Sequence, residues 1–140
     1  MPVVFHELVP VSLKQRKPLK FFINHLFQKE RKKLQSHDII FCSDEYLLEI
    51  NKQHLQHNFY TDIITFDLSD SPSSIIGELY ISIDRVRDNA TTLNISFTTE
   101  LLRVIFHGAL HLCGYKDKKL SDIKIIRQKE DDYLKSYHNL

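Results

Sequence analysis

The stretch HGALHLCGYKDK, residues 107–118, carries side chains whose types and spacing suit metal chemistry. Two residues four apart on a helix project from the same face, so His107 and His111 can bind one ion. Gly114 can adopt the left-handed conformation that ends a helix, which lets the chain turn back and brings Asp117 within reach. Three protein ligands with room for water are typical of a catalytic metal site, whereas structural zinc sites are closed.

The spacing also matches part of the zinc-protease pattern H-E-x-x-H-x-x-G-x-x-H, in which the glutamate is the general base. Gly108 occupies the position of that glutamate, and Asp117 that of the third histidine. Peptide hydrolysis by the protease mechanism is therefore not expected. The alternative is that both histidines are packed core residues. His54 and His57, three apart, have no third ligand nearby and are predicted to be surface residues.

These residues require a scaffold, and hydrophobic periodicity predicts one of alternating element types. We expect strands at 3–6, 37–42, 60–68 and 77–83, with a loop at 69–74. We expect one helix from Pro18, a second from Ser43 to about His54, and a short one around 85–90. A long apolar helix should run from Ser96 or Thr98 to Gly114. A last helix should begin at Ser121, with Ile123, Ile126 and Leu134 on its inner face. This order predicts an α+β fold, a small mixed sheet with helices packed largely on one face.

Composition limits the class of protein. A chain of 140 residues with 42% hydrophobic and 26% charged residues predicts one globular domain, 1–140. No basic segment precedes a long apolar run at the N-terminus, and no apolar run suits a bilayer, so we expect a cytoplasmic protein without a membrane partner. Cys42 and Cys113 lack metal-finger spacing and are expected to be buried reduced thiols.

Charge is unevenly distributed along the chain. Residues 14–33 contain eight Lys or Arg against Glu30 alone, whereas residues 37–84 contain nine carboxylates and one lysine. Such segregation is compatible with a positive surface for a polyanion. Taken alone, the charge pattern is better explained by a solvated helix face.

The stretch resembles the signature H-G-x-L-H-L-x-G-Y-D-H of the YbeY family of bacterial endoribonucleases, also called rRNA maturation factors. Upstream, residues 51–67 resemble the family segment in which an asparagine precedes a T-D/N-V-L-S/T-F strand, and residues 77–86 resemble the G-D/E-I-x-I strand that follows. The matching positions are His107, Gly108, Leu110, His111, Leu112, Gly114, Tyr115, Asn51, Thr61, Asp62, Thr65 and Phe66.

The chain departs from the family pattern at two functional places. The third family histidine falls at Asp117, preceded by Lys116 in place of an aspartate. A carboxylate is an accepted zinc ligand, but its charge should acidify bound water less and relax selectivity toward harder metals. Leu55 stands where many family members have an arginine, so the catalytic residues beyond the ligands stay unknown.

The resemblance implies a zincin-like metal helix and a metal-dependent endoribonuclease for single-stranded RNA. It further implies roles in maturing the 16S rRNA 3′ end and in ribosome quality control, with the ribosome or small-subunit factors as partners. We expect one Zn²⁺ or other divalent ion per chain and a monomer. Thr61 and Asp62 are candidates to support the ligands, or simply polar strand residues. Candidate RNA contacts are Arg85, Arg103, Lys116 and Lys118.

Two other functions are compatible with the same residues. The first is a metal-dependent hydrolase of another substrate. The second is a non-catalytic ribosome-assembly factor with a structural metal, which the departures at Leu55 and Asp117 make worth testing.

Overall fold

The computed structural model describes residues 2–54 and 61–140. Its strands are β1 (Val3–Glu7), β2 (Lys33–Cys42), β3 (Ile63–Asp67) and β4 (Ser74–Ser82). Its helices are α1 (Arg16–Lys29), α2 (Asp44–His54), α3 (Ile83–Leu93), α4 (Phe97–Leu112) and α5 (Leu120–His138). The order of element types is the predicted one.

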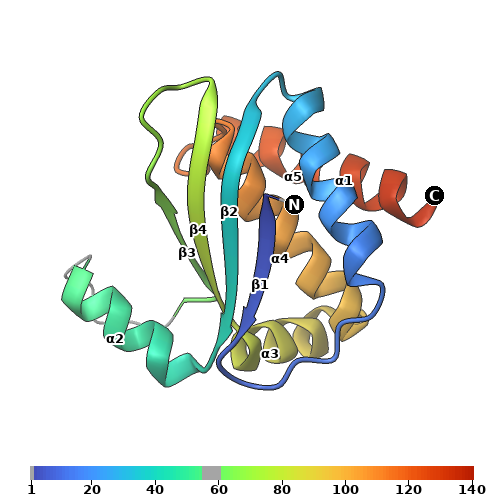
Figure 1. Cartoon of the computed structure of the whole chain (residues 1–140). Helices are drawn as coiled ribbons and strands as arrows, with labels where there is room; N and C mark the ends of the chain where they lie inside the picture. Colours follow the sequence, from blue (N-terminus) through green and yellow to red (C-terminus); the bar gives the residue numbers. More distant parts are fainter. Residues whose placement is uncertain (1, 55–60) are drawn as a thin grey trace.

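The strands form one mixed sheet in the order β1-β2-β4-β3. β1 pairs with β2 and β2 with β4 in parallel, while β3 runs antiparallel to β4 at the edge. Figure 1 shows α4 and α5 behind the sheet and α1 beside them, while α2 stands apart near β3. The predicted α+β fold, with a mixed sheet and helices largely on one face, is confirmed.

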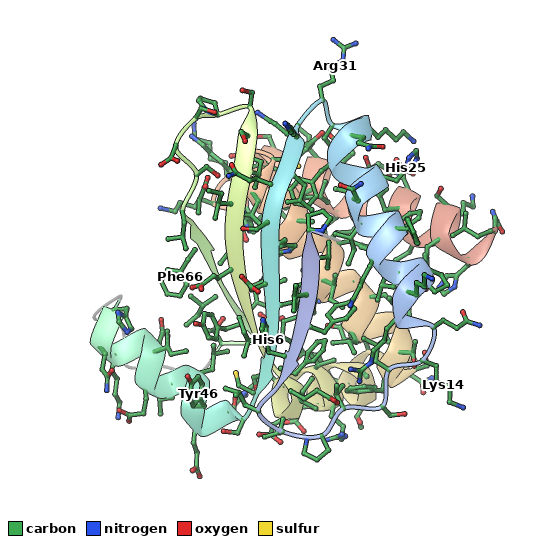
Figure 2. All side chains as sticks on the ribbon, in the orientation of Figure 1. His6, Lys14, His25, Arg31, Tyr46 and Phe66 are labelled. Atoms are coloured by element: carbon green, nitrogen blue, oxygen red, sulfur yellow. The ribbon has the colours of Figure 1, made fainter. Side chains whose placement is uncertain are left out.

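Strand alternation explains why one face of the sheet receives most of the helices. Ile39, Phe41, Leu79 and Ile81 point to the same side and are fully buried with the apolar faces of α1, α4 and α5. The intervening residues face the other side, where Cys42 and Ile64 form a smaller cluster with Leu47 of α2. Figure 2 shows Tyr46 and Phe66 on this second side.

Element boundaries differ from the prediction where long-range pairing decides them. β4 begins at Ser74, the last residue of the predicted loop, because Ser74 pairs with Lys33 across the sheet. β3 is shorter than the predicted 60–68 strand, and residue 60 lies outside the described residues. On α5 the predicted Ile126 is fully buried and Ile123 and Leu134 are half-buried, but Glu130 and Tyr133 are buried as well.

No helix among the described residues is long and apolar enough to cross a membrane. Both cysteines are free, as predicted: Cys42 is buried and Cys113 half-buried. Burial raises the pKa of each thiol to about 12, aided by Asp84 and Asp44 at Cys42 and by Glu30 at Cys113. Neither thiol is therefore a ready nucleophile or metal ligand at neutral pH.

Candidate metal centre

The structure brings His107, His111 and Asp117 together. Nε2 of His107 lies 2.9 Å from Nε2 of His111, and Oδ2 of Asp117 lies 3.4 and 3.2 Å from these two nitrogens. One ligand atom from each residue lies within 4.8 Å of the other two. The three side chains therefore form a set of two imidazoles and one carboxylate that suits a single divalent ion.

The end of α4 places Asp117 opposite the histidines. Gly114 has a φ of 107°, and no atom would lie within 4 Å of a Cβ there, so backbone conformation alone explains the glycine. Its N–H donates to the carbonyl of His111, and the N–H of Tyr115 donates to that of Leu110. This pair of bonds is the Schellman arrangement, which ends the helix and reverses the chain toward its last turn.

The surroundings of Gly108 explain why this chain has no glutamate at the position of the protease general base. Gly108 is buried where α4 crosses β4, and a Cβ at this position would lie 2.6 Å from Cδ2 of Leu79. Leu79 is itself fully buried. The position is therefore used for close contact between helix and sheet, and it has no room for a carboxylate facing the ligands.

Hydrogen bonds to the other ring nitrogens orient both imidazoles. Nδ1 of His107 lies 2.5 Å from Oε2 of Glu130, and Nδ1 of His111 lies 2.9 Å from the carbonyl oxygen of Tyr115. Since a carboxylate and a carbonyl accept, each Nδ1 carries the proton and each Nε2 presents a lone pair. Two lone pairs facing each other at 2.9 Å repel unless a cation lies between or beside them. The donor set therefore fits a metal ion.

Glu130 belongs to a buried ionic network. Its Oε1 accepts from Nη1 of Arg103 at 3.0 Å, and Arg103 also donates to both carboxylate oxygens of Glu100, at 2.8 and 2.6 Å. Burial alone would raise the pKa of Glu130, but hydrogen bonds and charges from His107 and Arg103 outweigh it and lower that pKa. Glu130 is therefore an anion at neutral pH, suited to keep the His107 ring in one orientation.

A cavity of about 660 Å³ opens beside the ligands, between α4 and β3. Thr61 and Asp62 both line it, as does the buried Asn51. The Oδ2 atom of Asp62 accepts from Asn89 at 3.3 Å, and Asn89 also lies 3.5 Å from Glu100. Asp62 is thus linked through Asn89 to the ionic network, which is compatible with the predicted supporting role.

The predicted RNA contacts separate into two groups. Lys118 lines the cavity, and Lys116 is exposed on the same turn. Arg103 is committed to Glu100 and Glu130 with only 15% of its side chain exposed, and Arg85 pairs with Asp44 away from the cavity. Burial opposes the raised pKa of Arg103, and its two glutamates more than compensate. Both arginines therefore have structural ion pairs, and a contact of either with RNA stays a prediction.

Leu55 and His57 lie outside the described residues, so the position of the family arginine is not placed. His54 is exposed in the last turn of α2, as predicted, with its ring 6.3 Å from that of Phe66.

Glu130 was not among the residues predicted for the site, although its position on α5 carries a signal. Positions 126, 130 and 133 share one face of α5, and two of them are the apolar residues Ile126 and Tyr133. A carboxylate on an inward stripe requires a buried partner. The partner itself, His107, follows only from the packing of α5 on α4.

Comparison with known proteins agrees with this geometry. A family model described as Endoribonuclease YbeY matches residues 9–138. A curated relative of that name from Cytophaga hutchinsonii is 46% identical over 93% of this chain and 91% of its own length. Another, from Flavobacterium psychrophilum, is 47% identical over 84% of this chain and 83% of its own length.

Among solved structures, the solution structure of TM1509 from Thermotoga maritima superimposes with a TM-score of 0.67 at 28% identity. The match covers 96% of this chain and 89% of that one. Family model, relatives and fold agree with the resemblance of the signature stretch, and the chain therefore belongs to the YbeY endoribonuclease family.

Proposed function

We propose that this protein is a metal-dependent endoribonuclease that cuts single-stranded RNA, including the 3′ end of 16S rRNA during maturation of the ribosome. The printed names of its relatives support the reaction class. The observation that carries the proposal is the pair of Nε2 atoms, each with its Nδ1 bound to an acceptor, converging with Asp117 at an open cavity.

His107, His111 and Asp117 would bind Zn²⁺ or another divalent ion, one per chain. Glu130 and the Tyr115 carbonyl would keep both imidazoles in the tautomer that offers Nε2. The carboxylate of Asp117 would neutralise part of the ionic charge and widen the choice of metal toward Mn²⁺.

RNA carries its own nucleophile, the 2′-hydroxyl, so the protein needs no counterpart of the protease glutamate. A bound divalent ion supplies polarisation of a phosphoryl oxygen or a nucleophile at neutral pH. Among the cavity-lining residues that the structure describes, Lys118 is the only Lys or Arg. Its ammonium would pair with a phosphate next to the scissile one and so position the strand.

We further propose that the protein acts in the cytoplasm as a monomer, with ribosomal RNA and small-subunit factors as partners. The basic residues of α1 would add salt-sensitive, sequence-independent affinity rather than contacts at the cleavage site. α1 packs against β1 and β2, whereas the cavity lies beside β3 at the other edge of the sheet.

The test is cleavage of a single-stranded RNA by the purified wild type and by His111→Ala, with and without chelator. The matched control is His25→Ala, since His25 is exposed on α1 (Figure 2) and belongs neither to the candidate ligands nor to the cavity lining. We expect wild type and control to cut, chelator to stop both, added Zn²⁺ or Mn²⁺ to restore both, and His111→Ala to be silent.

Equal cutting by all preparations would indicate a contaminating nuclease and contradict the assignment of the site. Retention of metal and RNA binding without any cleavage would instead favour a non-catalytic assembly factor. Cleavage of a peptide or another ester in place of RNA would indicate the alternative hydrolase.

A further inference from the structure

Glu30 is a half-buried carboxylate that is not one of the three candidate ligands. Glu30 follows the last residue of α1, and its side chain is 9% exposed. Its Oε1 accepts from the hydroxyl of Tyr115 at 2.7 Å, and its Oε2 accepts from Tyr133 and, at 3.3 Å, from Lys129. One side chain thus joins the end of α1 to α5 and to the turn after α4.

Tyr115 connects this carboxylate to a ligand. Its carbonyl oxygen accepts the Nδ1 proton of His111 at 2.9 Å, while its hydroxyl donates to Glu30. Its N–H is bonded to Leu110 within the same helix end. Two groups from other elements hold the Tyr115 side chain: Glu30, which accepts from its hydroxyl, and Lys129 of α5, whose ammonium lies 5.7 Å from the centre of its ring.

The charge of Glu30 strengthens this connection. Burial by itself would raise the pKa of Glu30, but hydrogen bonds from Tyr133 and Tyr115 and the charge of Lys129 lower it on balance. Glu30 is therefore ionised at neutral pH, and hydrogen bonds to an ionised acceptor are shorter and stronger than neutral ones. The Tyr115 ring is correspondingly well fixed, and with it the carbonyl that His111 uses.

From these contacts we propose that Glu30 is a positioning residue for the metal ligand His111, acting through the hydroxyl and the carbonyl of Tyr115. The inference rests on the metal site proposed above. It assigns the two ligand histidines separate supports: Glu130 of α5 for His107, and Glu30, directly after α1, for His111 through Tyr115.

Tyr115 and Tyr133 offer a matched pair of variants. Tyr115→Phe and Tyr133→Phe each remove one hydroxyl that donates to the same carboxylate, but only Tyr115 is bonded to His111. A purely structural Glu30 would make the two variants alike. If Glu30 positions His111, Tyr115→Phe weakens metal binding, whereas Tyr133→Phe leaves metal binding unchanged.

The measurement is the dissociation constant for Co²⁺ in the full-length protein, by chelator competition, together with the visible absorption of the bound ion. Loss of a direct outer partner of a ligand weakens binding about 10- to 100-fold, so a partner one residue further away should cost about 3- to 10-fold. We expect that loss, with a changed Co²⁺ spectrum, for Tyr115→Phe and for Glu30→Gln. The double variant should lose no more than either single one, because both changes break the same connection.

Wild-type Co²⁺ affinity and spectrum in Tyr115→Phe would overturn the inference while leaving the metal site intact. Equal losses in Tyr115→Phe and Tyr133→Phe would overturn it as well, by showing that Glu30 acts only through stability. Failure of the wild type to bind Co²⁺ at all would overturn the metal site and this inference together.

Discussion

At the scale of single residues, the centre depends on which ring nitrogen of each histidine carries a proton. Glu130 and the Tyr115 carbonyl decide this for His107 and His111, and both are acceptors. The grouping of His107, His111 and Asp117 was predictable because these residues lie within one helix and the turn that ends it. Glu130, which orients His107, was not predictable, because it lies on α5 and contacts His107 only through the packing of α5 on α4.

Asp117 provides the sharpest residue-scale prediction. We expect Asp117→Ala to remain folded and to lose metal affinity by more than about 100-fold, beyond the effect of losing an outer partner. Asp117→His should regain affinity and prefer Zn²⁺ over Mn²⁺ more strongly than the wild type, because imidazole suits zinc better than manganese. Metal content and competition titrations measure both effects.

The control for these variants is Asp131→Ala, an exposed carboxylate on the outer side of α5. Full metal occupancy in Asp117→Ala would remove Asp117 from the ligand set and leave only the histidine pair.

At the scale of elements, the contact between Gly108 of α4 and Leu79 of β4 decides how closely α4 approaches the sheet. Element types were predictable from periodicity, since each helix and strand has its own apolar spacing. The first and last residues of these elements were harder to predict. The first residues of β2 and β4 pair with each other across 41 positions of sequence, Lys33 with Ser74, and no local pattern contains that information.

Gly108→Ala tests this contact. Alanine favours a helix by about 1 kcal/mol over glycine, but overpacking a filled core costs about 1–3 kcal/mol. The added Cβ would lie 2.6 Å from the side chain of Leu79, and that side chain is fully buried, so it cannot shift toward solvent. We expect a net loss of about 1 kcal/mol, seen as a melting temperature about 4 °C lower.

Gly108→Glu, which rebuilds the protease motif, should fail to fold rather than gain peptidase activity. A Gly108→Ala protein more stable than the wild type would show that Leu79 adjusts freely and that the close approach is not required.

At the scale of the whole molecule, the buried His37 makes stability depend on pH. His37 is fully buried against the ring of Phe27, its Nδ1 lies 3.2 Å from the Gly77 carbonyl, and its Nε2 has no partner among the described residues. Burial lowers the pKa of His37 from 6.5 to about 4, against smaller opposing effects of the Gly77 bond and of Asp38.

Between these two pKa values the unfolded chain binds a proton that the folded chain does not, so stability falls as pH falls from 6.5 to about 4. The loss should reach about 3 kcal/mol for a shift of this size. His37→Asn retains a donor for Gly77 and cannot titrate, so its unfolding free energy should lack this slope. Denaturant unfolding from pH 4 to 7 measures it; an equal slope in both proteins would contradict the assignment.

The three ligands lie within residues 107–117, and this short span has a consequence for the life of the protein when metal is scarce. An ion bound there closes a loop of only a few residues and cross-links no distant segments, so it removes little chain entropy from the unfolded state. The sheet and helices should persist without it. Metal depletion would then leave folded but inactive protein. Cleavage would resume when the metal is supplied again, without refolding or new synthesis.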